Sequence, residues 1–157
     1  MDDDIEFLAT VMPRVTEAET ALHNGDAAPR RAMWSGNDPQ MLFGAVMTRI
    51  GRDHVAPAFD LLASRFSDCT SFRYEVIASG ARGDLAYIAG IEHTTASIGG
   101  AEPLPYALRV TTVFRREGGE WKIIHRHGDA LPDRDSGATR LQFGRLEQPG
   151  GSTGGAE

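Results

Sequence analysis

Apolar residues recur at helical spacing early in the chain, which predicts that a helix comes first. From residue 5 to residue 22 they mark one face of a helix, and the acidic run Asp2–Asp4 favours its N-terminus through the helix dipole. Pro13 is expected to kink this helix or split it in two. Asp26 can cap a short second helix over residues 27–34. The first third of the chain is therefore predicted to be helical.

The pattern changes along the chain, from helical spacing to strands. Gly51 precedes a third helical stripe, and after Asp68 aromatic and β-branched residues become frequent. Strands are expected over residues 72–78, 85–97, 106–116 and 121–129, with a turn at residues 80–84. Helices followed by a meander predict an α+β fold, in which a curved, cone-shaped antiparallel sheet carries the helices on its concave side.

A length of 157 residues suits one domain, and the apolar content falls after residue 130. We expect a single domain over residues 1–130 and a C-terminal tail over residues 131–157. The last ten residues are rich in glycine and serine and are predicted to be disordered.

Charge and cysteine content exclude several classes of partner and site. The chain has 16 Lys and Arg against 22 Asp and Glu, a net charge of −6, which disfavours nucleic acid and anionic membranes as partners. Cys69 is the single cysteine, so neither an internal disulfide nor a cysteine-based zinc site is expected. With no export signal and no spanning segment recognisable, a cytoplasmic protein is expected.

The dipeptide Gly118-Gly119 is a strong signal for a two-residue hairpin, and it predicts the register of the last two strands. Counting back from the turn places Thr112 opposite His125 and Val110 opposite His127. These side chains share an apolar face with Phe114, which is the composition of a pocket wall. Arg126 is then expected on the opposite, outer face.

Four segments of the chain resemble the NTF2-like superfamily, specifically its SnoaL-like and ketosteroid-isomerase-like branch. The resemblance covers residues 5–130 and implies a cystatin-like cone with a deep pocket and a homodimer formed through the sheet. The fold hosts isomerases, dehydratases, cyclases and non-enzymatic binding or assembly domains, so it does not define an activity. The segments are Leu22-His23-Asn24-Gly25-Asp26, Leu42-Phe43-Gly44, residues 108–116 and Gly119-Glu120-Trp121-Lys122-Ile123-Ile124-His125-Arg126-His127.

The catalytic groups of the ketosteroid isomerases are missing from the matching positions. Ala18 stands at the tyrosine position, Leu42 near the position of the general base, and Thr112 at the second acid position. The isomerase mechanism is therefore not expected. The same alignment implies that Tyr87 and His93 lie on the pocket wall.

Histidines are the strongest candidates for chemistry, because imidazole exchanges protons near neutral pH. His125 and His127 are the predicted acid–base pair, although both could instead be structural. His23 and His54 are interpreted as surface residues. The residues expected to contact a ligand are His93, Thr112, Tyr106, Tyr87, Trp34, Phe43, Val110 and Phe114.

The sequence therefore predicts a protein that binds a small, largely apolar molecule in the cone. If it is an enzyme, cofactor-free dehydration, isomerisation or cyclisation is expected, with neither a metal nor an organic cofactor. The alternative is a non-catalytic ligand-binding or dimerisation module of the same fold.

Overall fold

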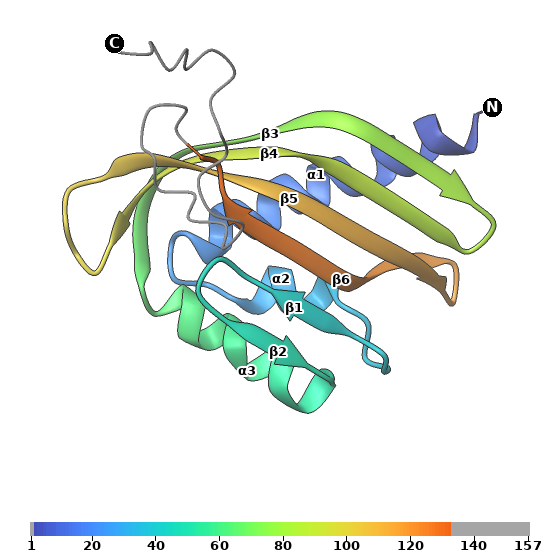
Figure 1. The fold of residues 1–157 in the computed structure, drawn as a ribbon, viewed down its shortest axis with the longest axis horizontal. Helices are drawn as coiled ribbons and strands as arrows, with labels where there is room; N and C mark the ends of the chain where they lie inside the picture. The colour runs from blue at the N-terminus through green and yellow to red at the C-terminus, as the bar shows by residue number, and fades with distance from the viewer. Residues whose placement is uncertain (1, 133–157) are drawn as a thin grey trace, which may run out of the picture.

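The computed structural model describes residues 2–132, so the predicted tail lies almost wholly outside the described residues. A helical first part is followed by long strands, as the sequence predicts (Figure 1). In chain order the elements of the described part are α1 (Asp3–Leu22), α2 (Ala28–Met33), β1 (Met41–Phe43), β2 (Thr48–Ile50), α3 (Arg52–Ala63), β3 (Phe66–Arg82), β4 (Leu85–Ile98), β5 (Leu104–Glu117) and β6 (Glu120–Ala130).

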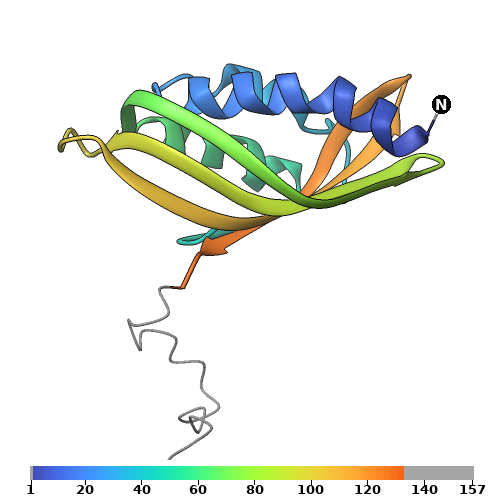
Figure 2. The ribbon, with the colours of Figure 1, turned by 90° about the horizontal axis from the view of Figure 1, so that it is seen from above.

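The strands form one curved sheet in the order β2-β1-β6-β5-β4-β3. Neighbouring strands are antiparallel, except that β1 runs parallel to β6. Seen from above, the sheet bends around the helices, which lie on its concave face (Figure 2). This arrangement confirms the predicted α+β class. None of the helices within residues 2–132 is long and apolar enough to cross a membrane.

Pro13 does not split the first helix in two, which was one of the two outcomes expected from the sequence. The α1 helix is continuous from Asp3 to Leu22. Pro13 lies on the exposed side of the helix, so the carbonyl that its missing N–H leaves unpaired can be hydrated. Burial of the opposite side, which includes Phe7, Val11 and Leu22, supports the helix through this position.

The sheet is larger than the sequence pattern predicts. The β3 strand begins at Phe66, because the polar stretch that follows it pairs with the far end of β4. At its other end β3 continues to Arg82, which leaves Gly83 and Asp84 as the turn. The short strands β1 and β2 were not predicted; β1 extends the sheet beside β6.

The core lies between the concave face of the sheet and the helices. Phe7 of α1 packs edge-on against both Phe114 of β5 and Trp121 of β6, with ring centroids 5.1 Å apart in each pair. On α3, Phe59 is fully buried and packs against Trp34. The apolar faces of α1 and α3 thus pack against the concave face of the sheet.

The last hairpin forms at the predicted turn but changes register beyond it. Glu117 pairs with Glu120 and Phe114 with Ile123, as the two-residue turn predicts. The next pair is Val113 with His125, which leaves Ile124 as an extra residue in a β-bulge. Because side chains alternate between the faces of a strand, this one residue exchanges the faces of everything that follows in β6.

Candidate functional site

The bulge moves the two predicted catalytic histidines out of the cone. His125 pairs with Met41 and His127 with Phe43, and both imidazoles pack against the Phe43 ring at 5.1 and 5.8 Å between centroids. Arg126, between them, is buried on the concave face. The predicted placement of His125, His127 and Arg126 is therefore wrong, and Phe43 lies with the histidines on the convex face.

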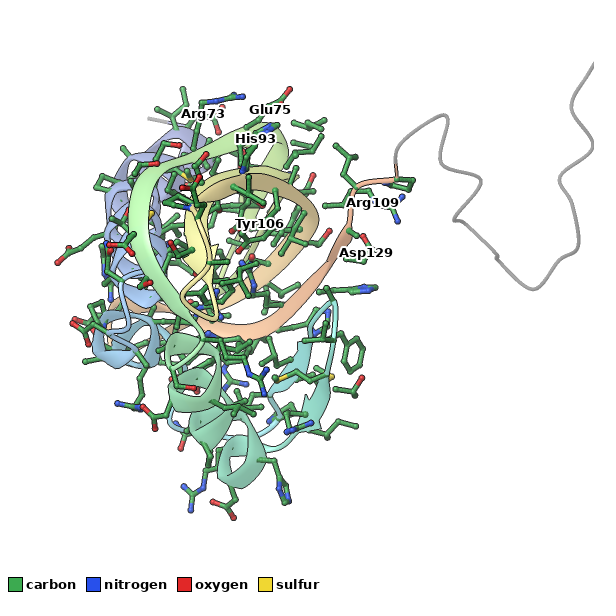
Figure 3. All side chains as sticks on the ribbon, turned by 90° about the vertical axis from the view of Figure 1, so that its left-hand side faces the viewer. Arg73, Glu75, His93, Tyr106, Arg109 and Asp129 are labelled. Carbon is green, nitrogen blue, oxygen red and sulfur yellow. The ribbon has the colours of Figure 1, made fainter. Side chains whose placement is uncertain are left out.

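The predicted wall residues of β4 also lie on the convex face. Ile88, Glu92 and Thr94 are buried, whereas Tyr87 is 43% exposed. Nε2 of His93 makes an exposed hydrogen bond with the carboxylate of Glu75 at 2.9 Å. Figure 3 shows Arg73, Glu75 and His93 outside the curved sheet, and Tyr106 within it. The alignment that placed Tyr87 and His93 on the pocket wall is therefore wrong by one residue.

Other predicted ligand-binding positions do lie inside the cone. Thr112, Phe114 and Trp34 line a small cavity, and Tyr106 lines a larger one. Val110 is buried on the same side of β5 as Thr112. Val110, Thr112 and Phe114 come from the part of the hairpin argument that concerns β5, which the bulge in β6 does not affect.

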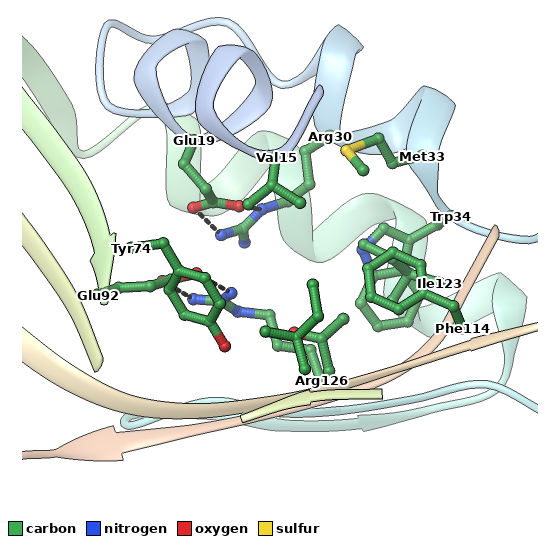
Figure 4. A pocket seen from close by; sticks show the side chains of 12 residues that line it. Val15, Glu19, Arg30, Met33, Trp34, Tyr74, Glu92, Phe114, Ile123 and Arg126 are labelled. Atoms are coloured by element: carbon green, nitrogen blue, oxygen red, sulfur yellow. Dashed lines mark hydrogen bonds and ion pairs between the residues drawn. The ribbon is translucent and has the colours of Figure 1, made fainter. Parts of the chain in front are cut away.

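Two buried ion pairs occupy the centre of the cone, and we call their four members the charged quartet. Glu19 of α1 accepts two hydrogen bonds from Arg30 of α2, at 2.9 and 2.5 Å. Glu92 of β4 accepts two from Arg126 of β6, at 2.8 and 2.6 Å. Figure 4 shows the two pairs facing each other between helices and sheet. The quartet joins four elements and has no net charge.

Burial and pairing act in opposite directions on the quartet. Burial disfavours the ionised form of Glu19, but the charges of Arg30 and Arg126 outweigh this effect and lower its pKa to about 2. Burial likewise disfavours the Arg126 cation, and the carboxylates of Glu92 and Glu19 more than compensate, raising its pKa. Glu19 and Arg126, one member of each pair, therefore stay ionised at neutral pH.

A cavity of about 210 Å³, the large cavity, lies beside the quartet. Arg30 and Arg126 form part of its wall, together with His23 and Tyr106. The remaining lining is mostly apolar and comes from both long helices, the strands β1, β3, β4, β5 and β6, and the β1–β2 connection: Leu22, Leu42, Gly44, Ala45, Val46, Met47, Leu62, Phe66, Ile98, Leu108 and Gly128. The large cavity thus combines apolar walls with a few polar groups, as small-molecule sites do.

A small cavity of about 10 Å³ lies on the other side of the two arginines, which line both cavities. Its volume is comparable to the space that one buried water requires. The indole Nε1 of Trp34 is buried at its wall and has no hydrogen-bond partner among residues 2–132. This N–H group is a further donor near the quartet.

His23 is buried beside the large cavity, although the sequence predicted a surface residue. It is 3% exposed and follows the last residue of α1. Its Nδ1 donates to the main-chain carbonyl of Glu19 at 2.7 Å, and its Nε2 accepts from the hydroxyl of Tyr106. Burial lowers the pKa of His23 and raises that of Tyr106 to about 12, so both are neutral at pH 7.

Metal ligation is not evident within the described part of the chain. Among residues 2–132, no three His, Cys, Asp or Glu side chains gather where they could hold one ion. Near the cone, the carboxylates of Glu19 and Glu92 are already bound to arginines.

The sequence did not lead us to pair either acidic member of this site with an arginine, although Glu19 had a readable signal. Glu19 stands four residues after Val15 and three before Leu22, both on the apolar stripe of the first helix. A charged residue at that spacing is expected to face the core and to require a partner. No comparable spacing identified Glu92 or Arg30.

Comparison with known proteins agrees with the fold. A model of the SnoaL-like domain matches residues 11–131. Among similar solved structures is an NTF2-like protein of unknown function from Pseudomonas putida KT2440, with 21% identity, coverage of 83% of this chain and 91% of that chain, and a TM-score of 0.62. Another is a protein of the NTF2-like family from Streptomyces avermitilis, provisionally named a dehydratase, with 17% identity, coverage of 82% of this chain and 98% of that chain, and a TM-score of 0.64. A third is an uncharacterised protein with a cystatin-like fold from Caulobacter vibrioides, with 18% identity, coverage of 79% of this chain and 89% of that chain, and a TM-score of 0.59. No curated protein matched the sequence.

The curved sheet with helices on its concave face is an NTF2-like α+β fold. Because the family model spans most of the chain, the protein belongs to the SnoaL-like domain family. At these levels of identity the solved structures establish the fold alone.

Proposed function

We propose that the protein binds a small, neutral, largely apolar molecule in the large cavity, through an acceptor atom on that molecule. The observation that carries this proposal is that the large cavity has apolar walls and is bordered by the charged quartet, whose charges balance. Arg30 and Arg126 face the large cavity, and each is already neutralised by a carboxylate.

The size and lining of the large cavity limit the ligand. Its volume of about 210 Å³ is below the roughly 300–1,000 Å³ of pockets that hold drug-sized molecules, so the ligand is small. Leu22, Leu42 and Phe66 lie on its wall, and burial of apolar ligand surface against such side chains supplies most of the binding energy.

The polar groups of the cavity favour a neutral acceptor. A guanidinium has five N–H donors, and Glu92 occupies only Nη1 and Nη2 of Arg126. Donors therefore remain for a carbonyl or ether oxygen of the ligand. A carboxylate would bring an uncompensated charge into the cone, because the quartet is balanced and His23 is neutral.

The first prediction compares two ligands that differ in charge. Cyclohexanone, as the neutral probe, is expected to bind about tenfold more tightly than cyclohexanecarboxylate, a difference of about 1.4 kcal/mol. Glu92→Gln leaves Arg126 without a charge partner and should reverse the preference. Titrations followed by NMR would measure both affinities in both proteins.

A matched variant covers the risk that Glu92→Gln does not fold. Glu19→Gln removes the balancing charge of Arg30 instead, and the same reversal is expected. Glu75→Gln is the control, because Glu75 pairs with His93 on the convex face and should leave both affinities unchanged. Failure of both probes to bind the wild-type protein, or equal affinity for the two, would contradict the proposal.

A second candidate function, self-association through the convex face, is supported by exposed apolar side chains. Ile77 is 68% exposed, and Tyr87 and Leu85 are also exposed. Two contacts between polar side chains on this face are made within the chain, since Arg109 contacts Asp129 and His93 contacts Glu75. A partly apolar face of this kind suits a second copy of itself.

The oligomeric state tests this second candidate. The wild-type protein is expected to have the mass of a dimer in light scattering, and Tyr87→Lys should shift it to a monomer by placing a charge in the interface. Leu61→Lys, at a residue of α3 with similar exposure, should remain a dimer. A monomeric wild-type protein would rule this candidate out.

A further inference from the structure

We propose that residues 141–146, beyond the described part of the chain, pack over the mouth of the large cavity and cover it. The occupant of this surface is therefore a segment of the same chain. The contact itself does not depend on a ligand. Its effect on ligand exchange rests on the proposed function, because it requires that the ligand binds in the large cavity.

Exposed apolar side chains lie at the mouth of the large cavity, and we call Val46, Ile98 and Leu104 the apolar rim. They are 84%, 54% and 67% exposed. Val46 and Ile98 line the cavity and are exposed, so they mark where it opens to solvent. Leu104 pairs with Ala96, which is buried on the concave face, so Leu104 lies on that face too. The apolar rim is an unpartnered apolar surface, which calls for a partner.

The chain leaves the described part beside the apolar rim. The β6 strand ends at Ala130, which pairs with Leu108 of the cavity wall. The β1 strand runs parallel beside β6, so the β1–β2 connection that carries Val46 lies next to the end of β6. Figure 1 shows this connection, the β4–β5 connection and the end of β6 towards the left of the view. The tail therefore starts next to the surface that it covers.

The tail is long enough to return to the apolar rim. Leu141 follows Pro132 by nine residues, a separation that an extended chain bridges over up to about 30 Å. The distance to cover is shorter. Leu131 donates its main-chain N–H to the carbonyl of Ala107, which precedes the end of the rim at Leu104 by only three residues along β5, or roughly 10 Å.

Composition identifies residues 141–146 as the part of the tail that packs there. Leu141, Phe143 and Leu146 are the only large apolar residues after Leu131. The rest of the tail is polar or rich in glycine and has little apolar area to bury. Contact between these three side chains and the apolar rim removes both from water, which is the driving force for the contact.

The tether favours a segment of the same chain over a second copy of the protein. Residues 133–140 join the segment to the end of the described part, beside the apolar rim. A short tether of this kind holds a binding segment at an effective concentration of roughly millimolar. A second copy must reach the same surface from dilute solution, so the segment of the same chain outcompetes it.

A disulfide trap tests the contact in the full chain. Val46→Cys and Phe143→Cys are combined with Cys69→Ser, and the protein is oxidised in air. Because a disulfide needs Cα atoms within about 7 Å of each other, we expect rapid closure to a product with the mass of one chain. Ile77→Cys with Phe143→Cys and Cys69→Ser is the matched control, since Ile77 is 68% exposed but lies on the convex face. We expect the control pair to close roughly tenfold more slowly.

Two outcomes of the trap would overturn the proposal. Equal rates of closure for the two pairs would show that residue 143 has no preference for the apolar rim. A product with the mass of two chains, in place of the intramolecular one, would assign the rim to a second copy.

The exchange of cyclohexanone measures the consequence for the large cavity. Phe143→Ser removes the largest apolar side chain of the cover and should raise the dissociation rate about tenfold in NMR exchange measurements. Gln142→Ser, at the neighbouring polar residue, is the control and should leave the rate unchanged. An unchanged rate in Phe143→Ser would overturn the cover. Failure of cyclohexanone to bind at all would contradict the proposed function alone, because the disulfide trap needs no ligand.

Discussion

Replacement of Arg126 by methionine is expected to lower the free energy of unfolding by about 3–5 kcal/mol. The substitution leaves the carboxylate of Glu92 buried without a partner, since the two side chains are 10% and 4% exposed in the native pair. It also removes a positive charge that helps Glu19 to stay ionised. Chemical denaturation of the purified variant would measure the loss.

Arg109→Met provides the control, because Arg109 makes an equivalent two-bond contact with Asp129 on the convex face. Both side chains of that pair are about half exposed and well hydrated, so the expected cost is much smaller than that of Arg126→Met. The double variant Glu92→Leu/Arg126→Met removes the buried pair as a whole and should recover much of the lost stability. Equal costs for the two single arginine variants would contradict the buried network.

Gly90→Ala is expected to cost about 3 kcal/mol, although it adds only a methyl group. An added Cβ would lie 2.1 Å from the main-chain oxygen of Glu75, on the neighbouring strand β3. Because the close atom belongs to a paired backbone, the two strands must separate to relieve the clash. Gly90 pairs with Val76 at the irregularity in β3, where the chain has little freedom to adjust.

Gly128→Ala is the matched control for this substitution. Gly128 is also a strand glycine, but its added Cβ would meet ordinary contacts at 3.5 Å or more. We expect its free energy of unfolding to lie within about 0.5 kcal/mol of the wild-type value. Thermal and chemical unfolding of both variants would test this difference. Similar losses in the free energy of unfolding would show that the close approach of the Glu75 oxygen to Gly90 does not determine the stability of the sheet.

Much of the fold could be predicted from the sequence, because helix stripes, turns and strand composition are local signals. Asp26 illustrates this in part, since its side chain accepts from the N–H of Ala28 at the start of α2, although the N-cap position itself is occupied by Ala27. Gly118 and Gly119 likewise form the expected turn with positive φ angles of 56° and 82°. These features depend on residues that are neighbours in the chain.

The site was predicted less well, because it depends on the bulge at Ile124 and on contacts distant in sequence. One unpaired residue placed Arg126 inside the cone and His125 outside it, and no local pattern distinguishes the two registers. The partner of Arg126 is Glu92, 34 residues away. The stripe of α1 did contain Glu19, so buried charge on a helix face was the one accessible clue.

The cyclohexanone titration, followed at the histidine side chains, tests the central claim most directly. If the large cavity is the binding site, the imidazole resonances of His23 shift in a saturable way, whereas those of His125 and His127 on the convex face do not. Saturable shifts at His125 and His127, with His23 unchanged, would contradict the account.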